Sequence, residues 1–163
     1  MKHSITTGFS FGSTSGIITT IGLMIGLYAG TGSRLAILGG IITIAISDAM
    51  SDAMGIHMSE EAENVHTPAQ IWASTISTFF FKFVFAISFI LPVLCFGLRT
   101  AVIISVAWSL LLLTTLSYFL AKKQETSAYK AISEHLMIAI IVITITYFVG
   151  EWVKMRFGVT QVI

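Results

Sequence analysis

Residues 71–97 read IWASTISTFFFKFVFAISFILPVLCFG, an almost unbroken apolar run in which Lys82 is the one charged residue. A helix needs about 20 mostly apolar residues to cross the hydrocarbon core of a bilayer, whereas apolar runs of about 10–14 residues are typical of buried helices in soluble proteins. The length of this run therefore predicts a membrane-spanning helix.

Four further apolar runs of similar length flank this one, at about 8–30, 36–58, 100–121 and 129–153. The polar breaks between them are short, so consecutive helices must run antiparallel. Strands of a membrane barrel alternate in polarity over about ten residues, and these runs do not alternate. We expect an all-α integral membrane protein with five spans, a single transmembrane domain over residues 1–163 and a short acidic cytoplasmic loop at 59–68.

The composition agrees with this class. Hydrophobic residues make up 55% of the chain and charged residues 10%, whereas about a quarter of the residues in a soluble domain are charged. The formal net charge is +1, which argues against nucleic-acid binding because that function needs a strongly basic surface. Cys95 is the only cysteine, which excludes an intramolecular disulfide and a cysteine-based zinc site.

Glycines of the first span recur every fourth residue in two sets: Gly8, Gly12 and Gly16, then Gly22, Gly26 and Gly30. At about 100° per residue they lie along one face of a helix, with Ser15 and Thr19 on the same stripe. Such a face lets two helix backbones approach closely within a membrane. Packing against a helix of the same chain is one interpretation. Because five helices are few for enclosing a pathway, we expect a homodimer with the first helix near the two-fold axis.

The second span carries carboxylates where lipid is expected. Asp48 and Asp52 lie four residues apart and so share one helix face. Charged residues at such depth cost a few kcal/mol each and usually line ion or proton pathways. Two neighbouring carboxylates also repel unless a cation or a shared proton lies between them. This face therefore predicts a cation pathway; the alternative is an internal ion pair or a hydrogen bond between helices.

The donor atoms near these aspartates indicate the class of ion. Carboxylate and hydroxyl oxygens suit hard divalent ions, and the thioethers of Met50 and Met54, on a second face of the same span, suit softer transition metals. The mixture favours Fe²⁺ or Mn²⁺, although packing is an alternative role for the methionines. Glu60, Glu61 and Glu63 follow as either a metal-collecting mouth or a solvated acidic turn.

Two further charged residues are candidates for coupling. Lys82 lies too deep to reach the membrane surface easily, so it needs a buried partner. We expect it to face Asp48 or Asp52, to compensate their charge without metal, and to compete with an entering metal ion in a way that couples transport to protons. Glu134, near the start of the fifth span, is expected to extend the pathway. Pro92 is expected to kink the third helix.

Three stretches resemble the vacuolar iron transporter family, of the VIT/CCC type: residues 14–20, residues 47–55 with Ser59 and Glu63, and residues 145–150. The resemblance implies a five-span homodimer that exports Fe²⁺ or Mn²⁺ from the cytosol, in exchange for protons. It also implies a cytoplasmic N-terminus, which the balanced distribution of Lys and Arg over the two sides does not decide. Asp48 matches the aspartate of the family's second-span motif.

The chain departs from the family pattern at three places. Ser15 stands where the family has a first-span aspartate, and Asp52 stands where it has a second-span methionine. A carboxylate has in effect moved from the first helix to the second, and we expect Ser15, Asp48 and Asp52 to line the pathway. The family's metal-binding region after the second span is reduced here to a short Glu-rich loop.

These features favour a divalent-metal transporter whose partners are the lipid bilayer, metal ions, protons and a second copy of the chain. No cofactor is expected beyond the transported metal. A carrier or channel for another cation and a non-transporting assembly protein remain alternatives. An enzyme is not expected, because no nucleophile–base pair stands at a usual spacing. The lack of extensions favours a prokaryotic inner membrane, or a vacuolar-type membrane in a eukaryote.

Overall fold

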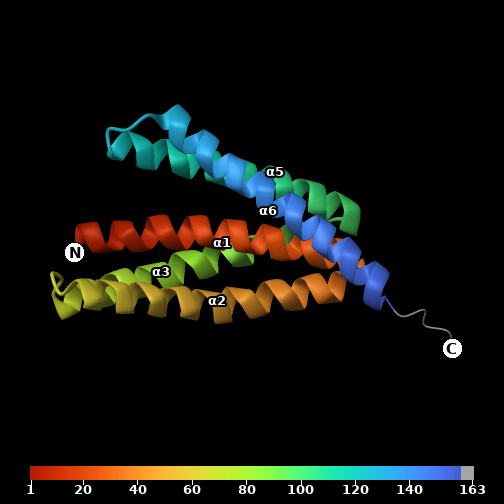
Figure 1. Cartoon of the computed structure of the whole chain (residues 1–163), viewed down its shortest axis with the longest axis horizontal. Coiled ribbons are helices and arrows are strands. Elements are labelled where there is room, and N and C mark those ends of the chain that lie inside the picture. The colour runs from red at the N-terminus through yellow and green to blue at the C-terminus, as the bar shows by residue number, and fades with distance from the viewer. Residues whose placement is uncertain (159–163) are drawn as a thin grey trace.

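The computed structural model describes residues 1–158, and this part of the chain is all-α. Figure 1 shows the course of the chain. Its helices are α1 (Lys2–Thr31), α2 (Arg34–Glu63), α3 (Pro68–Ser88), α4 (Ile90–Cys95), α5 (Leu98–Lys123) and α6 (Ala128–Phe157). Within the described residues, five helical segments are long and apolar enough to cross a membrane, with α3 and α4 together forming one of them. The predicted number and order of long apolar helices are confirmed.

Local sequence signals explain where these helices begin and end. Ser33 starts α2 by accepting a hydrogen bond from the Ala36 backbone N–H, and Gly32 closes α1 in the left-handed region at φ 57°. Thr67 and Gln70 form a capping box at the start of α3, which satisfies backbone N–H groups that lack a partner inside the helix.

The connection between α2 and α3 is shorter than the loop predicted at 59–68. Helix α2 continues through Glu63 and ends at Asn64, whose φ of 53° is left-handed. The run Ser-Glu-Glu-Ala-Glu prolongs the helix because glutamate and alanine are good helix formers. The acidic residues therefore lie on the last turns of a helix, and residues 64–67 make the turn.

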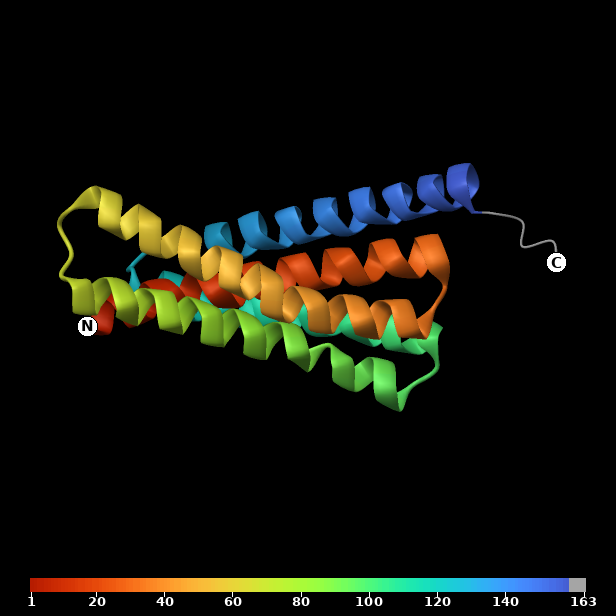
Figure 2. The ribbon, with the colours of Figure 1, turned by 90° about the horizontal axis from the view of Figure 1, so that it is seen from below.

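The kink expected at Pro92 is a break between α3 and α4. A proline has no backbone N–H to donate to the carbonyl of residue i−4, and its ring crowds that carbonyl; for Pro92 this residue is Ser88. Helix α3 ends at Ser88, and the N–H of Phe89 bonds the carbonyl of Ala86 in a tighter turn. The chain then continues in the same general direction as α4 (Figure 2).

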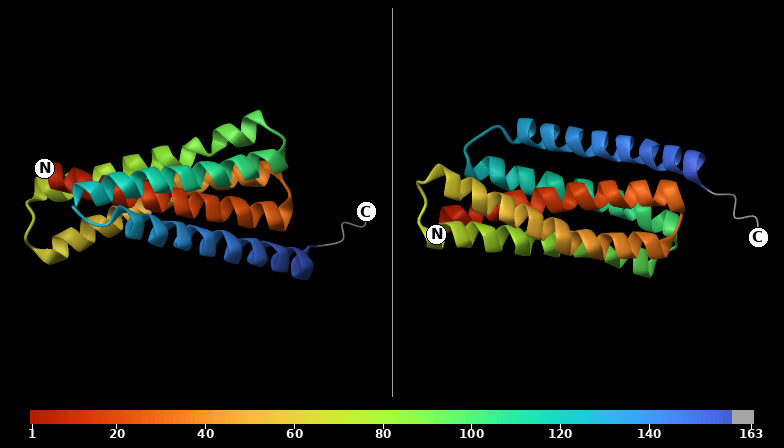
Figure 3. Two further views of the ribbon diagram at one scale, coloured as in Figure 1. Left: turned by 90° about the horizontal axis from the view of Figure 1, so that it is seen from above. Right: turned by 60° about the horizontal axis from the view of Figure 1, so that its bottom comes forward.

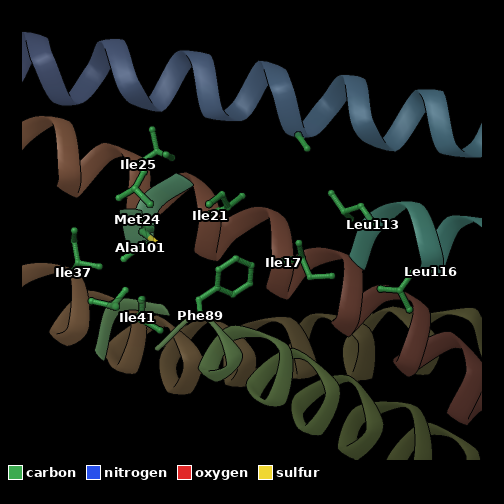
Figure 4. Packing of buried hydrophobic residues seen from close by; sticks show 13 residues of the cluster. Ile17, Ile21, Met24, Ile25, Ile37, Ile41, Phe89, Ala101, Leu113 and Leu116 are labelled. Atoms are coloured by element: carbon green, nitrogen blue, oxygen red, sulfur yellow. The ribbon is translucent and has the colours of Figure 1, made fainter. Parts of the chain in front are cut away.

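The long helices lie side by side with their axes in roughly the same direction, and α1 lies among the others. It packs against α2, α3, α5 and α6, with α2 and α3 on one side and the α5–α6 pair on the other (Figure 1). The N-terminus and the α2–α3 and α5–α6 connections lie at one end of the bundle, here called the N-terminal end (Figure 3). The apolar core centres on buried side chains of α1, including Ile17, Ile21 and Met24 (Figure 4).

The glycine stripe of α1 serves contacts within the chain. The first three glycines face α3: a Cβ at Gly12 would lie 2.5 Å from the Thr78 carbonyl oxygen, and one at Gly16 would lie 2.8 Å from that of Lys82. The last three face α6, where a Cβ at Gly30 would lie 3.3 Å from the Gly150 carbonyl oxygen. Helices α3 and α6 of the same chain therefore cover the stripe, so it no longer supports placing α1 at a two-fold axis.

Candidate functional site

The buried side chain of Lys82 joins three helices at one point. Its Nζ atom on α3 lies 2.5 Å from Asp52 Oδ2 and 2.6 Å from Asp48 Oδ2, both on α2. The same nitrogen lies 3.0 Å from Ser15 Oγ on α1. The sequence predicted that Lys82 would face Asp48 or Asp52, and the structure confirms this for both carboxylates. We call these four residues the Lys82 cluster.

The two aspartates are held differently within the cluster. Asp52 Oδ2 accepts hydrogen bonds from Lys82 Nζ and from Ser15 Oγ, the latter at 2.7 Å. Asp48 Oδ2 contacts the ammonium as an ion pair but is not aligned for a hydrogen bond. Asp52 is therefore the better fixed of the two carboxylates, and Asp48 is the freer one.

The backbone of α1 lets these side chains meet. Gly16 follows Ser15 and has no Cβ, and an added Cβ would lie only 2.8 Å from the Lys82 carbonyl oxygen and 3.2 Å from its Cγ. The spacing of four residues puts Asp48 and Asp52 on one face of α2, directed at the same ammonium. Close approach of α1 and α3 thus brings the base of the lysine near α1, while its tip reaches α2.

The Lys82 cluster has more negative than positive charge, and its carboxylates are more exposed than its ammonium. Two carboxylates and one ammonium sum formally to −1. The side chain of Lys82 is 2% exposed, whereas those of Asp48 and Asp52 are 33% and 23% exposed. The carboxylates can therefore be reached from the protein surface, and the ammonium lies behind them.

A groove leads to Asp48 between α1, α2 and α6. It has a volume of about 450 Å³, and its remaining lining is almost entirely apolar. The lining residues are Ile18, Thr19, Gly22, Leu23, Ile44, Val142 and Thr146. Asp48 is the one charged residue of this lining, and Lys82 takes no part in it.

Met50 and Met54 do not join the Lys82 cluster. Both are more than half exposed, and they line a separate apolar groove of about 390 Å³ with Trp72, Ile76 and Phe79 of α3. They lie on a different face of α2 from Asp48 and Asp52, as the sequence spacing indicated. The structure therefore brings oxygen donors together and leaves the thioethers apart.

The three glutamates at the end of α2 also separate. Glu60 is buried, and its Oε2 accepts a hydrogen bond from Ser74 Oγ at 2.5 Å. Glu61 is exposed. Oε2 of Glu63 lies 3.4 Å from Nε2 of His66. Among residues 1–158, no three His, Cys, Asp or Glu side chains are grouped so as to hold a metal ion.

Glu134 on α6 pairs with Lys130, at 3.9 Å on the same helix. Both side chains are largely exposed, as is usual for an ion pair one turn apart on a helix surface. The ion pair of Glu134 is therefore local to α6. The carboxylates that pair with Lys82 both belong to α2.

Sequence reasoning missed the partner of Glu60. Ser74, Thr78 and Lys82 lie four residues apart on α3, and all three are buried. This polar spacing inside an apolar run was the available signal for a second buried polar contact. Thr78 Oγ1, between the two contacts along α3, is buried and has no hydrogen-bond partner within residues 1–158.

Comparisons with protein-family models, with curated proteins and with solved structures find no match to this chain. The resemblance to the vacuolar iron transporters rests on the quoted motifs and stays a prediction.

Proposed function

We propose that the protein is a membrane transporter for divalent transition-metal ions, Fe²⁺ or Mn²⁺, working in exchange for protons. One observation carries this proposal: the ammonium of Lys82 lies between Asp48 and Asp52 in a bundle of five long apolar helices. A tethered cation thus occupies the place between two carboxylates where a mobile cation would bind.

Charge balance explains why metal entry would release a proton. With the lysine protonated, the Lys82 cluster carries a formal charge of −1. Adding a divalent ion while keeping the ammonium would give +1, whereas adding the ion and losing the lysine proton gives 0. Because uncompensated charge is costly in a medium of low polarity, the neutral state is favoured. Binding one metal ion is therefore coupled to the release of one proton from Lys82.

The donor set suits hard divalent ions. Asp48, Asp52 and Ser15 offer carboxylate and hydroxyl oxygens, which suit Mn²⁺ and also Mg²⁺ and Ca²⁺. The choice of Fe²⁺ or Mn²⁺ therefore rests on the resemblance to the vacuolar iron transporters. Asp48, the freer and more exposed carboxylate, makes the first contact through the groove between α1, α2 and α6. Asp52 and Ser15 complete the coordination after Lys82 has left its place. The methionines take no part in this step.

The membrane setting and direction of transport belong to the proposal. Five apolar helices are compatible with an integral membrane protein. On the resemblance to the vacuolar iron transporters, the N-terminus is cytoplasmic and the metal leaves the cytosol through a prokaryotic inner membrane. The homodimer is proposed on the same resemblance, and its interface lies away from the glycine stripe of α1.

A second candidate function is transport of another cation. The formal charge of −1 on the Lys82 cluster equals that balanced by one monovalent cation, and Asp48 faces an apolar groove. A monovalent cation would neutralise the cluster without displacing the lysine proton. Proton release therefore distinguishes the two candidates.

The test uses purified protein in liposomes that contain a metal-sensitive dye and a pH-sensitive dye. We expect uptake of Fe²⁺ or Mn²⁺ with proton movement in the opposite direction. The triple variant Asp48→Asn, Asp52→Asn, Lys82→Met removes all three charges together and should fold without transport. Glu151→Gln, which removes a carboxylate paired with Lys154 on α6, is the matched control and should transport normally. Absence of metal uptake under pH gradients of both signs would refute the proposal.

A further inference from the structure

Two adjoining pockets lie between α1 and α5 at the N-terminal end of the bundle, away from the Lys82 cluster. The outer pocket, of about 360 Å³, is lined by Lys2, His3, Thr6 and Lys123. The inner pocket, of about 350 Å³, also reaches α6. The two pockets share Leu120 and Gln124, so one ligand can extend from the first into the second.

The outer pocket is positively charged. Lys123 Nζ donates to Thr6 Oγ1 at 2.8 Å, which holds the ammonium against α1. Within the described chain, neither Lys2 nor Lys123 has an acidic side chain within ion-pair distance, and no Asp or Glu lines either pocket. The nearby exposed Glu125 forms no such pair. The charge of this pocket is thus left for a ligand.

The inner pocket has a mixed polar and apolar lining that carries no carboxylate or ammonium. Its polar lining consists of Ser10, Thr14, Ser117, Gln124, Thr126 and His135. Ser117 Oγ and His135 Nδ1 lie 2.7 Å apart. Ser10 and Thr14 follow Thr6 by one and two turns of α1, so this pocket lies deeper along the bundle than the lysines. Ser10, Ser117 and Thr126 already donate to main-chain carbonyl oxygens of their own chain segment. The hydroxyl of Thr14 and the side-chain amide of Gln124 are the donors left for neutral acceptor oxygens.

We infer that these pockets bind one anionic phospholipid. The phosphate lies in the outer pocket against Lys2, His3 and Lys123, and the ester carbonyl oxygens accept hydrogen bonds in the inner pocket. A phospholipid in a membrane has this order, with charge at the surface and ester groups beneath it. Basic pockets between helices at the membrane surface recognise anionic head groups in this way.

Exposed apolar side chains beside the pockets offer a place for the acyl chains. Ile5 and Phe11 on α1 and Phe119 on α5 are each more than 40% exposed, and Phe11 itself lines the inner pocket. The inference depends on the membrane setting of the proposed function but not on metal transport. A failure of one therefore leaves the other testable.

The experiment measures lipid retention by the full chain in detergent, using native mass spectrometry with phosphatidylglycerol and phosphatidylcholine offered at equal concentration. We expect selective retention of phosphatidylglycerol. The double variant Lys2→Gln, Lys123→Gln should weaken that retention about 30-fold, since each lysine near an anionic head group contributes about a fivefold factor. Thr14→Val, which leaves the charge unchanged, should weaken it more modestly through the inner pocket.

The matched control is Lys154→Gln, Arg156→Gln at the other end of the bundle, which removes the same charge. It should retain phosphatidylglycerol like the unchanged protein. Equal retention of the two lipids would overturn the inference, and so would equal losses in the two double variants. Displacement of the lipid by millimolar inorganic phosphate would also overturn it, because the site would then recognise a free anion.

Discussion

The ammonium nitrogen of Lys82 lies 2.5 Å from Oδ2 of Asp52, which ties α3 to α2 inside the bundle. The same nitrogen lies 2.6 Å from Asp48. An ion pair with low exposure is costly to break because the remaining charge stays buried without compensation. The cluster is thus a structural tie and, on our proposal, the place where metal and proton compete.

Replacing Lys82 with methionine leaves two neighbouring carboxylates without their cation. We expect Lys82→Met to lower the free energy of unfolding by up to about 3 kcal/mol, the low end of the range for a buried pair, because the remaining carboxylates of Asp48 and Asp52 are 33% and 23% exposed. Thermal unfolding in detergent measures this loss. The triple variant Lys82→Met, Asp48→Asn, Asp52→Asn should recover most of the stability, and a triple variant as unstable as Lys82→Met would contradict the charge argument.

The two aspartates should respond unequally to neutralisation. Either single Asp→Asn change leaves one carboxylate and one ammonium, which balance. Asp52→Asn also weakens two hydrogen bonds by removing the charge of their acceptor, so we expect it to cost about 1–3 kcal/mol and Asp48→Asn to cost less than about 1 kcal/mol. The double variant leaves Lys82 alone and should cost more than the sum of the two. Denaturation curves of all three variants check this order, and additive costs would speak against a shared site.

Gly12 and Gly39 form a matched pair for testing the packing of α1. A Cβ at Gly12 would lie 2.5 Å from the Thr78 carbonyl oxygen, whereas one at Gly39 meets no atom within 4 Å in the single chain. We expect Gly12→Ala to destabilise by about 1–3 kcal/mol through overpacking. Gly39→Ala should be neutral or slightly stabilising, because alanine favours the helix. The midpoint of thermal unfolding distinguishes them, and equal midpoints would refute the close α1–α3 approach.

Ser74 should stabilise the protein through its hydrogen bond to Glu60. Removing its hydroxyl in Ser74→Ala deprives a buried carboxylate of the donor at 2.5 Å, which should cost about 1–3 kcal/mol. Glu61→Gln, which changes the exposed neighbour, should have little effect. Hydrogen exchange at the α2–α3 junction provides the measurement. Unchanged protection in Ser74→Ala would show that the hydrogen bond does not stabilise this end of the bundle.

Most of the fold could be predicted from local pattern. Hydropathy alone located the five long helices. Pro92 predicted a kink in the third of them, where the structure has a break between α3 and α4. The length of α2 was underestimated because polar residues such as Glu61 and Glu63 resemble a loop by composition, although they form helix readily. The depth of Lys82 in an apolar run also predicted that it needs a carboxylate partner.

The candidate site could be predicted only in part, because side-chain partners depend on how each helix is rotated about its own axis. Asp48 and Asp52 were identifiable as one face of α2. That Ser15 donates to Asp52, that Ser74 donates to Glu60, and that Met50 lies on the surface required the relative placement of α1, α2 and α3.

The sequence by itself determined which segments are helical and which charges need partners, since both follow from hydropathy and the cost of burying charge. Only the tertiary structure decided what each surface faces. The glycines of α1 permit close approach to any helix, and their spacing is equally suited to a second copy or to the same chain. Packing resolved this in favour of α3 and α6, because these helices bring their backbones against positions where no side chain stands in the way.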